Sequence, residues 1–193
     1  MMRHNRTGKH SREAGMTMIE LLFAGFVLVI GFMGSLILIF IAIASNSRNK
    51  TDTTATMLSQ LVIEQINVMP TNSGVPSIPV SDCITPNHTA ATTWDISITG
   101  GGGAGSSAGA TLVNDTSNPL HGTIDFTQKY ADVPTGYKME YYTCGDVTYD
   151  VRWHVKQVTG LTRLIIVSAR QKGASNNIQL FSPPVTLRTI SGP

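Results

Sequence analysis

The longest apolar stretch of the chain runs from Leu21 to Ala44. These 24 residues carry no charge, and Ser35 has their only hydroxyl group. At about 1.5 Å of rise per residue, such a stretch makes roughly 36 Å of helix, which exceeds the hydrocarbon core of a bilayer at about 30 Å. No other apolar stretch of the sequence is comparably long. The pattern predicts one membrane-spanning helix near the N-terminus.

A second apolar pattern follows the span. Apolar residues recur there at steps of three and four, which places them in one stripe along a helix. They are Ala55, Leu58, Leu61, Val62, Ile66 and Met69. Pro70 and the polar segment TNSG after it end the helix. We therefore expect one helix from about Met18 to Met69, with a transmembrane half (16–47) and an amphipathic half (48–70) that lies on a globular domain (71–193).

The clearest strand pattern lies in the C-terminal third. Apolar and polar residues alternate strictly there, as in an antiparallel strand with one buried and one solvent-exposed face. The apolar positions are Val147, Tyr149, Val151, Trp153 and Val155, and the polar ones are Thr148, Asp150, Arg152, His154 and Lys156. LTRLIIVSAR predicts a second strand, and IQLF with VTLRTI a last one, broken by Pro183 and Pro184. The expected class is α+β, with the long N-terminal helix packed on a C-terminal antiparallel β-sheet.

The middle of the chain has weaker patterns. The proline-containing residues 71–92 are expected to form a loop, and Thr93–Thr99 a short strand. Residues 100–110, which are mostly glycine, serine and alanine, predict a flexible loop. This segment lacks the G-K-[ST] of a phosphate-binding loop, so phosphate binding is not expected.

Charge before the span indicates its orientation. Residues 1–15 hold four basic side chains against Glu13, whereas only Arg48 and Lys50 follow the span closely, which favours a cytoplasmic N-terminus. The apolar run is too long for a secretory signal peptide, whose apolar core has about 7–15 residues. An ordinary signal anchor fits but gives no reason for Glu20, which could snorkel to the interface. The third interpretation is cleavage between Gly15 and Met16, which makes Glu20 the fifth residue of the mature chain.

The segment Gly15-Met16-Thr17-Met18-Ile19-Glu20, with its basic leader and the long span, resembles the type III signal of type IV pilins and type II secretion pseudopilins. The resemblance implies that a prepilin peptidase removes residues 1–15 and that Met16 is then N-methylated. VLVIGFMG in the span, and YDVRWHV followed by LTRLIIVSA, are most similar to PilV-type minor pilins and to pseudopilin I. The implied fold is pilin-like.

The same resemblance implies a role for Glu20 in assembly. Cleavage would create an ammonium group on Met16, about 6 Å along the helix from Glu20. An unpaired acid at mid-bilayer costs roughly 3 kcal/mol. In pilins, the fifth-position glutamate is taken to neutralise the N-terminal ammonium of a neighbouring subunit. Glu20 is therefore expected to set the register between neighbouring helices. Its unpaired charge is unfavourable in the isolated subunit, and pairing on assembly removes that cost.

Charge and residue spacing exclude several other classes. The whole chain has a formal net charge of +2 and an isoelectric point of about 8.6. Residues 1–15 contain four of the 14 basic residues and one of the 12 acidic ones, so the remaining chain has 10 basic and 11 acidic residues. The mature chain therefore has no excess of basic charge for nucleic acid. The five histidines are scattered, and no G-x-S-x-G motif stands out. We expect no catalytic residues, metal or cofactor, and hence no enzyme.

Cys83 and Cys144 are the only cysteines, and both follow the span. On the exported side of the membrane, oxidising conditions let a disulfide persist. We therefore expect a bond between them. Two free, buried thiols are the alternative.

The expected function is that of a minor type IV pilin acting in pilus assembly, priming or surface interaction. A type II secretion pseudopilin is the alternative within the family. A single-span membrane-anchored adhesive or ligand-binding protein is the alternative of another class. The partners implied by the resemblance are other major and minor pilins, the prepilin peptidase, an inner-membrane assembly platform and membrane lipid. The expected location is the bacterial inner membrane, as a single-pass protein, and then the periplasm or a cell-surface pilus.

Overall fold

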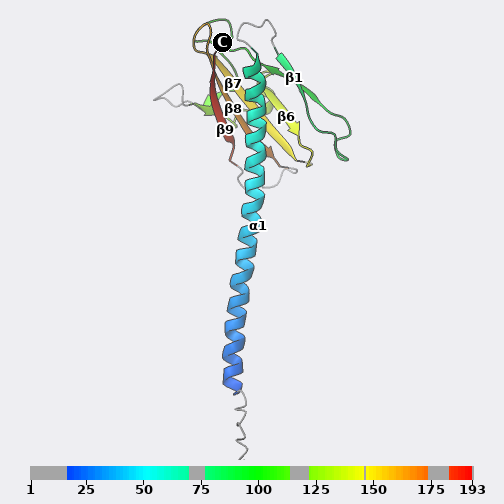
Figure 1. Ribbon diagram of the computed structural model, residues 1–193, viewed down its shortest axis with the longest axis vertical. Coiled ribbons are helices and arrows are strands. Elements are labelled where there is room, and N and C mark those ends of the chain that lie inside the picture. Colours follow the sequence, from blue (N-terminus) through cyan, green and yellow to red (C-terminus); the bar gives the residue numbers. More distant parts are fainter. Residues whose placement is uncertain (1–16, 70–76, 114–121, 146, 174–182, 193) are drawn as a thin grey trace, which may run out of the picture. The chain divides into compact units, whose positions relative to one another are not determined.

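The computed structural model describes residues 17–69, 77–113, 122–145, 147–173 and 183–192 (Figure 1). One long helix, α1, comes first, and strands with one short 3₁₀ helix, η1, follow it. The elements are α1 Met18–Val68, β1 Ser77–Ser81, β2 Thr93–Ser97, β3 Ser107–Gly109, β4 Leu112–Val113, β5 Thr123–Ile124, η1 Tyr130–Asp132, β6 Lys138–Tyr142, β7 Thr148–Gln157, β8 Arg163–Lys172 and β9 Val185–Ser191.

Contacts between residues divide the chain into two units, residues 1–46 and residues 47–193, and α1 continues through both. The first unit contains the apolar half of the helix. Its single hydroxyl group, on Ser35, donates to the carbonyl oxygen of Gly31 at 2.9 Å. This bond to the preceding turn satisfies the hydroxyl inside the helix itself, so Ser35 is compatible with an apolar environment.

In the second unit, one stripe of α1 packs on the core of the domain. The buried helix residues are Ala55, Leu58, Ser59, Val62 and Ile66. Four of these five belong to the apolar stripe predicted from the sequence. The helix ends at Val68, one residue before the predicted last residue Met69 and two before Pro70. The buried side of α1 therefore lies mainly along this apolar stripe.

The sheet is antiparallel throughout, with strand order β3-β7-β8-β9 and with β6 also paired to β7. The β7–β8 register places Trp153 opposite Val167 and Val155 opposite Ile165. These side chains are fully buried in the same core as the helix stripe. Tyr149 of β7 directs its hydroxyl group to the Thr51 carbonyl oxygen of α1 at 3.4 Å. The α+β class, a long helix on an antiparallel sheet, is thus confirmed.

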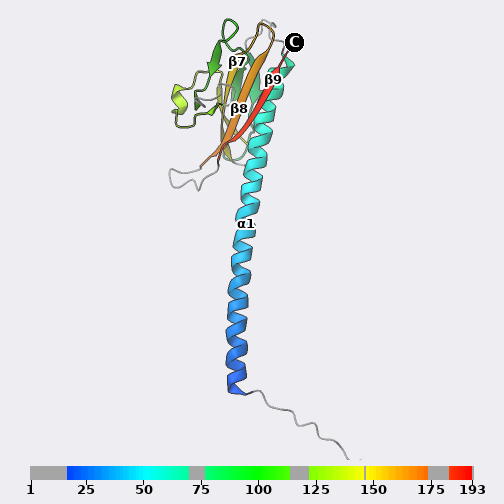
Figure 2. The same ribbon diagram turned by 90° about the vertical axis from the view of Figure 1, so that its left-hand side faces the viewer.

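The polar face of β7 differs from the prediction. Asp150 and Arg152, expected in solvent, are only 5% and 2% exposed. Figure 2 shows the reason: α1 lies on one side of the sheet, and the segment around η1 lies on the other. That segment binds the polar face, since Arg152 donates to the Gln128 carbonyl oxygen at 2.7 Å. The strict alternation correctly separated the apolar face of β7 from its polar face. It could not show that the segment around η1 packs on the polar face as well.

Two segments expected to be loops contain strands. Within residues 71–92, Ser77–Ser81 forms β1 and pairs with β2. Proline content indicated a loop here, but Pro79 is tolerated because each strand of a two-stranded sheet has a free edge. Within the glycine-rich residues 100–110, Ser107–Gly109 forms β3 on β7. Gly109 is required there, because its φ is 121° and a Cβ would lie 2.3 Å from the carbonyl oxygen of Trp153.

Candidate functional site

The apolar half of α1 is the first candidate functional site, because no other part of the described chain buries its hydrophobic side chains. The large hydrophobic residues from Met18 to Ile43 are between 38% and 84% exposed. By length and composition, α1 is long and apolar enough to cross a membrane. An added Cβ at Gly25, Gly31 or Gly34 would meet nothing within 4 Å. Packing within the described chain therefore does not require these glycines, whereas close contact between membrane helices would use them.

Glu20 lies in the first turn of this helix. Its backbone nitrogen is 3.0 Å from the carbonyl oxygen of Thr17 and 3.4 Å from its hydroxyl oxygen. Thr-x-x-Glu at a helix start is the sequence of a capping box, in which Thr17 caps the first turn and Glu20 occupies the third helical position. The Thr17 hydroxyl group therefore lies at the backbone of Glu20 as a helix cap, which the spacing of Thr17 and Glu20 could have revealed. Gly15 and Met16, the predicted cleavage and methylation site, lie outside the described residues.

Arg163 connects the other end of α1 to the sheet. Arg163 is 2% exposed, and its guanidinium group donates to the carbonyl oxygens of Ile66 and Met69, where the helix ends. A third bond of 3.1 Å goes to the carbonyl oxygen of Ile98. A cation at this position also interacts favourably with the negative, C-terminal end of the helix dipole. Burial lowers the pKa of Arg163 from its ordinary value, but an arginine keeps its charge.

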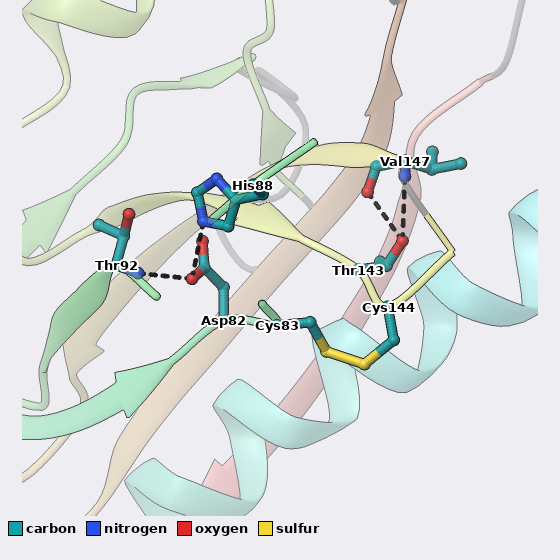
Figure 3. Close-up of a disulfide and its surroundings, with 7 residues drawn as sticks. All are labelled: Asp82, Cys83, His88, Thr92, Thr143, Cys144 and Val147. Atoms are coloured by element: carbon teal, nitrogen blue, oxygen red, sulfur yellow. Dashed lines mark hydrogen bonds and ion pairs between the residues drawn. A yellow bond between two sulfur atoms is a disulfide. The ribbon is translucent and has the colours of Figure 1, made fainter. Parts of the chain in front are cut away.

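Cys83 and Cys144, the predicted pair, form a disulfide with their Cα atoms 5.1 Å apart (Figure 3). The backbone nitrogen of Cys83 also donates to the carbonyl oxygen of Tyr142 at 3.0 Å. The bond therefore ties the end of the β1–β2 hairpin to the end of β6. This attaches the small two-stranded sheet to the five-stranded one.

Polar contacts hold the chain on both sides of the disulfide (Figure 3). Asp82 accepts from the Thr92 backbone nitrogen at 2.6 Å and lies 3.2 Å from Nε2 of His88. On the other side, the hydroxyl group of Thr143 donates to the Val147 carbonyl oxygen at 2.8 Å. These polar groups form hydrogen bonds with one another. We therefore interpret them as a structural support for the disulfide.

The polar face of β7 carries the second candidate. Asp150 accepts two bonds from Arg152, at 2.9 and 2.8 Å, so both of its carboxylate oxygens are used. Nη2 of Arg170 lies 3.8 Å from the same carboxylate. The sequence pattern placed Asp150 and Arg152 in solvent, and it placed Arg170 at the end of the second predicted strand without assigning it a role. The structure thus places Arg170 of β8 opposite Asp150 of β7, beside the Asp150–Arg152 pair.

Among the described residues, no group of three or more His, Cys, Asp or Glu side chains is placed to hold a metal ion. Comparison of the chain with protein-family models, with curated proteins and with solved structures returned no match.

Proposed function

We propose that this chain is a minor type IV pilin: a subunit stored in the inner membrane, processed by a prepilin peptidase, and built into or beneath a pilus. The observation that carries the proposal is α1 itself. It is one continuous helix with an exposed apolar half that begins with a single carboxylate, and with an amphipathic half that packs on an antiparallel sheet. Such a helix can anchor a subunit in lipid and later pack on the helices of neighbouring subunits.

The position of Glu20 supports assembly over simple anchoring. The helix dipole and the capping geometry stabilise an acid in the first turn by about 0.3–1 kcal/mol. The cost of an unpaired acid at mid-bilayer is roughly 3 kcal/mol. Local interactions therefore do not compensate for the charge if the helix start lies within the membrane. The ammonium group of a processed neighbour would supply the missing partner.

A type II secretion pseudopilin uses the same helix and the same processing, so it is the alternative within the family. Its partners distinguish the two: co-purification with pilus subunits supports the pilin, and co-purification with secretion-system subunits the pseudopilin. A membrane-anchored adhesive or ligand-binding protein would instead keep its leader and remain outside any filament.

The mature N-terminus tests the proposal. Protein extracted from membranes of cells with an active prepilin peptidase is analysed by mass spectrometry. We expect a chain that begins at N-methylated Met16. A Gly15→Leu variant should remain full-length, since a side chain at the junction obstructs the peptidase. Gly8→Leu, a matched change elsewhere in the leader, should be processed normally. A wild-type chain that still begins at Met1 or Met2 would contradict the proposal.

A further inference from the structure

A pocket of about 250 Å³ lies over the polar face of β7 and is lined in part by Tyr130 of η1. The segment around η1 lies on the side of the sheet opposite α1 (Figure 2). The charged lining of the pocket combines four cations with two acids, which leaves a formal excess of two positive charges. The cations are Lys129, Arg152, Arg170 and Lys172, and the acids are Glu140 and Asp150. A pocket of this balance favours an anion, provided that its cations are not already neutralised by their neighbours.

Two of the cations are neutralised. Arg152 forms the two-bond pair with Asp150 described above. Lys172 forms a 2.6 Å ion pair with Glu140 across the sheet. Each acid is therefore matched by a cation of its own. Arg170 and the exposed Lys129 supply the excess charge.

Arg170 is held in place without using its hydrogen-bond donors. Its guanidinium carbon lies 4.5 Å from the centre of the Phe126 ring, a cation–π contact. The side chain is 33% exposed, and within the described chain its nearest acid oxygen, on Asp150, is at 3.8 Å, beyond hydrogen-bond distance. Because Asp150 is already occupied by Arg152, the planar donor fork of Arg170 is available for a carboxylate.

Tyr130, also in the pocket wall, has an unpartnered polar group. Its hydroxyl group is inaccessible to solvent and has no hydrogen-bond partner in the described part of the chain. A buried hydroxyl group without a partner is unfavourable, so such a group calls for an explanation. Burial, and then the charges of Asp150 and Glu140, raise the pKa of Tyr130. The hydroxyl group therefore stays protonated, and it can donate to a ligand oxygen once the Tyr130 ring turns toward the pocket that it lines.

We infer that this pocket binds a small hydroxylated carboxylic acid of the sugar-acid class, such as a hexuronate. The carboxylate of the ligand pairs with the fork of Arg170. A ligand hydroxyl oxygen accepts from Tyr130, and other ligand hydroxyl groups donate to the acceptor-only oxygens of the more exposed Glu140. The rings of Phe126 and Tyr130 supply apolar wall, and the volume suits one sugar unit. This inference does not rest on the proposed function.

Isothermal titration calorimetry on the full chain in detergent micelles tests the site with three probes: galacturonate, galactose and acetate. Galactose lacks the carboxylate, and acetate lacks the hydroxyl groups. We expect galacturonate to bind at least tenfold more tightly than either, with an affinity that falls as salt rises. Equal binding of galactose, or no binding of galacturonate at millimolar concentration, would overturn the inference. Equal binding of acetate would overturn the sugar-acid assignment and leave a general carboxylate site.

Variants separate the site from general charge effects. Arg170→Gln and Tyr130→Phe should each weaken galacturonate binding about tenfold or more. Lys156→Gln removes one positive charge from the same strand pair outside the pocket, and it should leave the affinity unchanged. Because the Tyr130 hydroxyl group has no hydrogen-bond partner among the described residues, Tyr130→Phe should not lower the melting temperature. An unchanged affinity in Arg170→Gln, with its melting temperature retained, would contradict the inference.

Discussion

Arg163 lies where the C-terminal end of α1 meets strand β8, and it donates to carbonyl oxygens from both the helix and the segment after β2. Removing the donors leaves these buried carbonyl groups without partners. We expect Arg163→Met, which keeps most of the side-chain volume, to lower the free energy of unfolding by about 2–4 kcal/mol. Lys156→Met, on the neighbouring strand, should change it by less than about 0.5 kcal/mol. Urea unfolding of the full chain in micelles measures both, and similar values for the two variants would contradict this role.

His154 gives the domain a pH dependence. Its Nδ1 lies 2.9 Å from the carbonyl oxygen of Ala110, and burial lowers its pKa below the ordinary value despite that contact. Lys156 lowers the pKa further. As the pH falls through about 6.5, the unfolded chain takes up a proton that the folded chain does not, so folding becomes less stable.

The His154→Asn variant isolates this effect, because its amide can still donate to the Ala110 carbonyl oxygen but does not titrate. Between about pH 7.5 and 5.5 we expect wild type to lose more stability than the variant in urea unfolding. All other titrating groups, including His88 beside Asp82, are common to both proteins. Equal pH slopes would show that His154 does not contribute.

At the scale of elements, the disulfide joins two separate sheets across a sequence separation of 61 residues. In the chain-entropy model, closing a loop of that length is worth about 4 kcal/mol. Thiol counting under denaturing conditions should give no thiols before reduction and two after it. Reduction should also increase hydrogen exchange in β1 and β2, while β7 and β8 remain protected. Two reactive thiols in protein taken from the cell envelope would contradict the bond.

Elements with long and regular patterns could be predicted, and those specified by distant partners could not. The stripe on α1 and the alternation of β7 each repeat over several turns or residue pairs, so burial of their apolar face follows from sequence. In contrast, β3 forms only because Gly109 can approach the backbone of Trp153. The pocket needs Tyr130 from η1, Asp150 from β7 and Arg170 from β8. No local pattern in the sequence indicates that these three residues meet.

At the scale of the whole molecule, Glu20 has two possible roles that different substitutions separate. As a capping residue it needs a side chain that reaches back to the first turn, which Gln also provides. As the partner of a neighbour's ammonium group it needs a charge. Glu20→Gln therefore keeps the first role and removes the second, whereas Thr17→Ala weakens the cap and keeps the charge.

If charge pairing drives assembly, Glu20→Gln and Glu20→Ala should both be inserted in the membrane and processed normally, because neither step needs the acid. Both should enter filaments at least about tenfold less than wild type, which corresponds to about 1.4 kcal/mol per subunit. Thr17→Ala should enter close to the wild-type level. Quantitative immunoblotting of sheared filaments against membrane stores measures this, with the mature N-terminus of each variant checked by mass spectrometry. Incorporation of Glu20→Gln at the wild-type level, with loss only in Glu20→Ala and Thr17→Ala, would assign Glu20 to capping and remove charge pairing from the mechanism.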